Sequence, residues 1–84
     1  MIGKFAISKA GHDKSEAFVI VEAEGEFVYL CDGRCRTAAK PKKKRRKHIQ
    51  IIERTVSEDL LVKLQNREKI TDEQIRNALK TLKQ

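Results

Sequence analysis

Fourteen consecutive residues, 34–47, carry nine of the nineteen Lys and Arg side chains of this 84-residue chain and no acidic side chain. The rest of the chain holds ten basic and twelve acidic residues, so the net charge of +7 depends entirely on this run. Positive charges at such density repel one another, and binding a polyanion relieves the repulsion and releases counterions. Phosphate contact is therefore the first chemistry that the sequence predicts, and nucleic acid is the first partner.

Three other interpretations of the basic run stay open. A run of like charge is often a disordered tail, although apolar sequence follows this one and places it inside the chain. The string Pro41–Lys47 also fits a short nuclear-import signal, a pattern that any exposed basic heptamer satisfies. Attraction to an anionic membrane usually accompanies a transmembrane segment or a basic amphipathic helix. Neither is visible in the sequence, so we expect no membrane partner.

Two cysteines and two histidines, His12 and His48, offer atom types that bind zinc, but their spacing does not suit a site. Cys31 and Cys35 have no second matching cysteine pair. A tight turn between them would also send the two thiols to opposite faces of a sheet, with Cys35 buried and Cys31 half exposed. We therefore expect free, reduced thiols and neither a metal nor another cofactor.

Candidates for catalysis are weaker still. His12, Asp13 and Ser15 are neighbours within one turn, whereas a nucleophilic relay is assembled from side chains that meet in space. The four glycines are scattered and form no phosphate-binding loop. We therefore expect no catalytic residue, and the chain is predicted not to be an enzyme.

Length and composition predict one small cytoplasmic domain with a lean core. Hydrophobic residues make up 39% of the chain, below the roughly 45–50% of typical globular domains. No apolar stretch exceeds five residues, which is too short for a signal-peptide core or a membrane span.

The apolar pattern of the first half predicts five short strands. An Asp-Gly pair at 32 and 33 is favoured in two-residue type I′ turns, so the third and fourth strands should form a hairpin in which Tyr29 faces Arg36. Five strands in about fifty residues indicate a small barrel. The predicted strands are Lys4–Ile7, Ala17–Glu24, Phe27–Cys31, Arg34–Thr37 and His48–Ile52.

After Glu53 the apolar period becomes helical. Ser57 is placed to cap one helix, and Thr71 with Gln74 fits the capping box of a second. The predicted fold class is mainly β, a barrel of about five strands in residues 1–54 followed by two short α-helices in residues 55–84.

The first half of the chain resembles a KOW motif: a strand, a turn that carries Gly11 and Lys14, and a second, apolar strand. With its Ser-Lys-Ala-Gly turn, Asp-Gly-Arg hairpin and Lys-Pro-Lys-Lys-Lys loop, the segment Gly3–His48 is similar to bacterial KOW-domain RNA-binding proteins. Those resemble KOW-type large-subunit ribosomal proteins of archaea and eukaryotes. Ser15 departs from the pattern, because a Gly is common there. The resemblance implies an SH3-like barrel whose loops contact RNA, usually ribosomal RNA.

We therefore expect a cytoplasmic RNA-binding module, monomeric when free, that contacts ribosomal RNA or the ribosome through the basic loop 34–47. The two helices would pack on the barrel or on a protein partner. An alternative function is a protein interaction adaptor of the transcription machinery, where KOW barrels also occur. The expected RNA-contacting residues, with Tyr29 as a base-stacking platform, are Lys9, Gly11, Lys14, Tyr29, Arg34, Arg36, Lys40, Lys42, Lys43, Lys44, Arg45, Arg46, Lys47 and His48.

Overall fold

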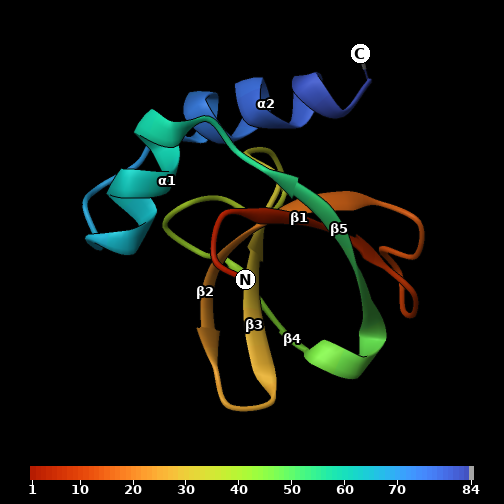
Figure 1. Ribbon diagram of the computed structural model, residues 1–84. Helices are drawn as coiled ribbons and strands as arrows, with labels where there is room; N and C mark the ends of the chain where they lie inside the picture. The colour runs from red at the N-terminus through yellow and green to blue at the C-terminus, as the bar shows by residue number, and fades with distance from the viewer. Residues whose placement is uncertain (84) are drawn as a thin grey trace.

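A computed structural model describes residues 1–83 and shows a mainly β chain with helices after the last strand (Figure 1). The five strands are β1 (Lys4–Ser8), β2 (Ala17–Glu24), β3 (Phe27–Cys31), β4 (Lys42–Arg45) and β5 (Ile49–Thr55). The helices are α1 (Glu58–Gln65), α2 (Asp72–Lys80) and the short 3₁₀ turns η1 (Arg46–His48) and η2 (Thr81–Lys83). The predicted fold class is confirmed.

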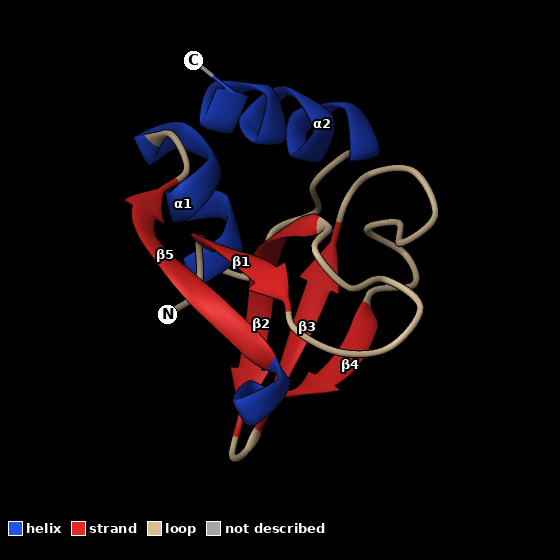
Figure 2. Cartoon of the chain, turned by 90° about the vertical axis from the view of Figure 1, so that its right-hand side faces the viewer, coloured by secondary structure: helices blue, strands red, loops and turns tan. Residues whose placement is uncertain are grey.

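The strands form one antiparallel sheet in the order β4-β3-β2-β1-β5. The sheet curves strongly, and η1 connects its two edge strands, β4 and β5 (Figure 2). This arrangement is compatible with an SH3-like barrel. The predicted bounds of β2 and β3 are confirmed. These two strands could be predicted because each contains an apolar run and is followed by turn residues.

Each face of the sheet carries a buried core of its own. Helices α1 and α2 lie together on one side of the sheet (Figure 1). The core beneath them contains Phe5, Val19, Cys31, Val56, Leu60, Leu64 and Ile75. The core of the opposite face contains Ala6, Phe18, Ile20, Val28, Leu30 and Ile49. Burial on both faces explains the unbroken apolar run of β2, and it means that the helices share a core with the sheet instead of forming a separate tail.

The fourth strand was predicted in the wrong place. It is Lys42–Arg45, and residues 32–41 are a loop. The carboxylate of Asp32 accepts the backbone N–H groups of Arg34 and Arg36 at 2.8 Å each, and this folds the loop back on itself. The Asp-Gly pair therefore forms a compact turn, as its chemistry favours, but the turn does not return a strand.

Gly33 is needed where this loop meets α2. Its φ is +77°, and a Cβ built there would lie 2.5 Å from the carbonyl oxygen of Asp72. The loop and helix are joined further, because Asp72 Oδ1 accepts the N–H of Ala38 at 2.7 Å and Arg76 Nη1 donates to Gly33 O at 2.7 Å. The glycine serves this close approach to α2, which local sequence does not reveal.

The structure reverses the predicted burial of the two cysteines, because the helices cover the face of β3 that carries Cys31 and because Cys35 lies in a loop instead of a strand. Cys31 is fully buried under the helices, and its Sγ donates to Thr37 O at 3.3 Å. Burial, followed by the charges of Asp72 and Asp32, raises the pKa of the Cys31 thiol to about 12. Cys35 is exposed in the loop. The predictions that Cys35 is buried and that Cys31 is half exposed are therefore both wrong.

The helix caps agree with the sequence at α2 and only in part at α1. Thr71 Oγ1 accepts from Gln74 N at 3.1 Å, and Gln74 Oε1 accepts from Thr71 N at 2.9 Å, which is the predicted capping box. Ser57 precedes α1 as predicted, but its side chain makes no capping hydrogen bond.

Candidate nucleic-acid interface

Neighbouring side chains of the basic run lie on opposite faces of β4. In the pairing with β3, Val28 lies opposite Lys44, and Tyr29 lies opposite Lys43. Because successive strand residues point to opposite faces, Lys43 and Arg45 are exposed while Lys44 is buried. The prediction of a basic loop is therefore wrong for residues 42–47, where a strand and the turn η1 hold the side chains in fixed directions.

Lys44 is the residue whose predicted role the structure corrects. Its side chain is 8% exposed, and Nζ donates to three oxygens. The acceptors are Ser8 Oγ at 2.6 Å, Ala10 O at 2.7 Å and Asp13 Oδ1 at 2.6 Å. An ammonium has three N–H donors, so none remains for a phosphate. Lys44 holds the turn after β1 to β4 and is not an RNA contact.

Asp13 completes this buried pair. Its Oδ1 also accepts from Ser8 Oγ at 2.8 Å, while Oδ2 has no hydrogen-bond partner among the described residues and lies 4.0 Å from Lys42 Nζ. Burial alone would raise the pKa of Asp13, but hydrogen bonds from Lys44 and Ser8, with the nearby ammonium charges, outweigh burial and lower that pKa from 3.8. The carboxylate is thus ionised and fixed at neutral pH.

The turn that resembles the KOW motif is tied to the basic run at two points. One is the Asp13 to Lys44 pair, and the other is the backbone hydrogen bond from Lys9 N to His48 O at 2.8 Å. The predicted contacts Lys9 and Lys14 are exposed on this turn. Gly11 has a φ of +88°, as expected of a turn glycine.

An aromatic residue not singled out from the sequence lies beside the exposed cations. Lys43 Nζ is 4.4 Å from the centroid of the Phe27 ring, and Arg45 Cζ is 5.3 Å from it. Tyr29 is two residues further along β3 and therefore on the same face. The predicted pairing of Tyr29 with Arg36 is wrong, since Lys43 is its neighbour. The two-residue spacing of Phe27 and Tyr29 was the signal that would have found Phe27.

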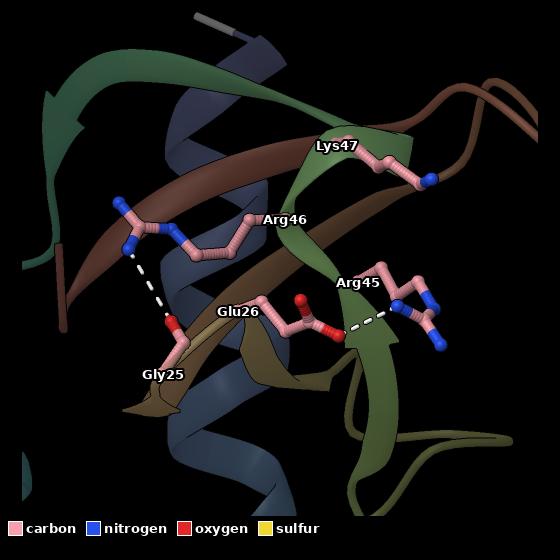
Figure 3. A pocket seen from close by; sticks show the side chains of 5 residues that line it. All are labelled: Gly25, Glu26, Arg45, Arg46 and Lys47. Atoms are coloured by element: carbon pink, nitrogen blue, oxygen red, sulfur yellow. Dashed lines mark hydrogen bonds and ion pairs between the residues drawn. The ribbon is translucent and has the colours of Figure 1, made fainter.

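An open pocket of about 450 Å³ adjoins this face where the β2–β3 turn meets η1 (Figure 3). Two of its cations are held by the turn: Arg45 Nη1 lies 2.6 Å from Glu26 Oε1, and Arg46 Nη1 donates to Gly25 O at 3.4 Å. Figure 3 shows Lys47 extending separately from these contacts. We call the exposed side chains of Lys43, Arg45, Arg46 and Lys47 the cationic surface.

The remaining predicted contacts are spread over other parts of the chain. Arg34 lines a second pocket against α2, away from the lining residues of the first. Arg36 is half-buried and Lys40 is exposed in the loop before β4, while Lys42 is half-buried beside Asp13. His48 is half-buried at the end of η1. Closeness in sequence thus does not make the nine basic residues one surface.

The described residues contain no group of three or more His, Cys, Asp and Glu side chains that could hold a metal ion. Within residues 1–83, no helix has both the length and the apolar character needed to cross a membrane. A scan against protein-family models finds no match, and a search of curated proteins finds none either.

Proposed function

We propose that this chain is an RNA-binding module that contacts ribosomal RNA through the cationic surface. The observation that carries the proposal is the placement of four exposed cations on β4 and η1, two of which flank the ring of Phe27. The resemblance to KOW-domain RNA-binding proteins favours the same function, in the cytoplasm. No catalytic role is proposed.

Three of the four cations are available to bind phosphate groups. Lys43, Arg46 and Lys47 make no ion pair with an acidic side chain in the described part of the chain. Arg45 pairs with Glu26, but both side chains are about half exposed or more, so solvent screens that pair. Each cation can therefore displace a counterion from a phosphate.

The aromatic residues favour RNA with unpaired bases. Phe27 and Tyr29 are both half-buried, which leaves part of each ring accessible on the face that carries Lys43 and Arg45. Aromatic side chains on a sheet stack with bases that are splayed out of a helix, and neighbouring cations hold the backbone. A loop or bulge of ribosomal RNA offers both groups.

The deciding experiment measures the affinity for a fluorescent RNA hairpin with a single-stranded loop at several salt concentrations. If four phosphates are engaged, the plot of log affinity against log salt should have a slope of about −3 to −4. Replacing Arg45, Arg46 and Lys47 with Gln should make the slope shallower by about 2 to 3.

The matched control replaces Lys63, Lys69 and Lys80 with Gln. Both triple variants reduce the net charge from +7 to +4, so only the position of the charge differs. The control should retain the slope of the unchanged protein. Equal losses in both variants would mean nonspecific attraction to any polyanion, and a slope near zero would reject RNA binding in favour of the adaptor of the transcription machinery.

A further inference from the structure

A second pocket, of about 680 Å³, lies between the sheet and α2 and takes no part in the proposed RNA contact. Its apolar lining comes from β1, β2, β5, α2 and η2. The side chains of this apolar floor are Ile7, Ala17, Ile52, Leu79 and Leu82. A volume of this size is within the range of about 300–1,000 Å³ that holds small ligands.

The floor is the part of the helix-covered face that the helices leave open. Ile7 lies opposite Ala17 in the β1–β2 pairing, two residues beyond the buried pair of Phe5 and Val19 on the same face. Ile7 and Ala17 are only half-buried. An apolar ligand placed there would bury Ile7 and Ala17, as the helices already bury Phe5 and Val19.

The rim of the pocket is mainly cationic. Arg76 and Arg54 each donate to a backbone carbonyl, Gly33 O at 2.7 Å and Thr81 O at 2.9 Å, and neither forms an ion pair with an acidic side chain among the described residues. The side chains of Arg34 and Lys80 have no hydrogen bond or ion pair within the described residues.

The pocket is also lined by two acidic residues, Glu16 and Asp32, which is fewer than its four cationic residues. Asp32 Oδ1 is already occupied by the N–H groups of Arg34 and Arg36. The pocket therefore has an excess of positive charge next to an apolar floor, which is the complement of a molecule with an apolar body and an anionic head.

We propose that this pocket binds a small amphipathic anion, with the apolar body on the floor and the anionic head at the cationic rim. The site is separate from the cationic surface, and the proposal does not depend on RNA binding. Cys35 lines the same pocket and is exposed, while Cys31 is fully buried. Alkylation of the native protein therefore reports on the pocket alone.

The test titrates the folded protein with 8-anilinonaphthalene-1-sulfonate and follows its fluorescence, with N-phenyl-1-naphthylamine as the uncharged analogue. We expect one site per chain, and binding of the analogue that is weaker by about tenfold. Saturation with the sulfonate should slow iodoacetamide modification of Cys35 by at least about fivefold. Replacing Arg34 and Lys80 with Gln should weaken sulfonate binding by about tenfold.

The matched control replaces Lys63 and Lys69 with Gln, which removes the same charge outside the pocket. It should leave sulfonate binding unchanged, and a saturating RNA hairpin should not displace the probe. The proposal would be overturned by unprotected Cys35, by equal affinity for the charged and uncharged probes, or by equal losses in the two double variants. Stoichiometric displacement by RNA would also overturn it, because the pocket would then belong to the RNA site.

Discussion

Lys44 and Asp13 form an ion pair of 2.6 Å in which both side chains are less than a tenth exposed. The lysine is the last of three consecutive lysines, Lys42 to Lys44, and the aspartate belongs to the turn after β1. Lys44 is thus part of the folded interior, although it comes from the most densely charged segment of the chain. Because its ion pair with Asp13 fixes β4 against the turn, the exposed side chains next to Lys44 are held in defined directions.

We predict that Lys44→Met destabilises the protein by about 3 kcal/mol or more, because the Asp13 carboxylate would remain buried without its cation. The exposed neighbour gives the matched control: Lys43→Met removes the same charge and only the contact with Phe27, so the loss should be about 1 kcal/mol or less. Urea unfolding measures both values. The buried pair would have no structural role if the two variants were equally stable.

The pH dependence of stability should report Asp13 directly. Its pKa in the folded protein is lowered from 3.8, so protonation favours the unfolded chain. The resulting stabilisation is complete above this ordinary value and disappears as the pH falls through the lower folded value. The difference in unfolding free energy between the unchanged protein and Asp13→Asn should therefore be largest near neutral pH and shrink below about pH 4.

The control for this pH series is Glu53→Gln. The hydrogen bond from Lys4 lowers the pKa of Glu53 too, but this carboxylate is exposed to solvent. Its substitution should change the pH profile far less than Asp13→Asn. Equal effects of the two substitutions would contradict the special role of the buried pair.

Substitutions at two positions of the turn after β1 should change the stability of the protein in opposite directions. Ser15 has a φ of +74°, a conformation that favours glycine, and Gly11 has a φ of +88°. Ser15→Gly should stabilise the protein by about 0.5–1 kcal/mol, and Gly11→Ala should destabilise it by about 1 kcal/mol. A Cβ at Gly11 would have room, with its nearest neighbours 3.7 Å away, so thermal unfolding would measure the backbone effect alone. A stabilising Gly11→Ala would refute the left-handed conformation.

The sequence predicted the strands that have apolar alternation or an apolar run, but not the one made of Lys42–Arg45. Lysine and arginine have low strand propensity, and this strand depends on pairing with β3 and on Asp13, a residue 31 positions away from Lys44. The Asp-Gly pair predicted a turn correctly, but the contact of Gly33 with α2 is long-range. The burial of both cysteines was predicted wrongly for the same kind of reason: Cys35 lies in a loop because the strand is elsewhere, and Cys31 is buried because α1 and α2, distant in sequence, cover its face of the sheet.

The charge pattern of the sequence predicted a candidate RNA site but did not predict the geometry of that site. Four of the predicted contacts, Lys43, Arg45, Arg46 and Lys47, lie together on β4 and η1, whereas Lys44 is internal and Arg34 lines another pocket. A charge count does not distinguish these environments, since burial depends on the register between β3 and β4. Phe27 shares the face of Tyr29 by its spacing in the sequence, but the pairing with β4 that brings Lys43 and Arg45 beside its ring was not predicted.

Phe27→Leu should separate base stacking from phosphate contact. Losing the ring should reduce the affinity for an RNA hairpin with a single-stranded loop by about tenfold, because stacking contributes about 1–3 kcal/mol per base. The slope of log affinity against log salt should not change, since Lys43 and Arg45 remain. Fully paired RNA is the control: its bases are already stacked, so its affinity should change little. Equal losses for the two RNAs, or a shallower slope, would show that Phe27 only positions the cations and that no base stacks on this face.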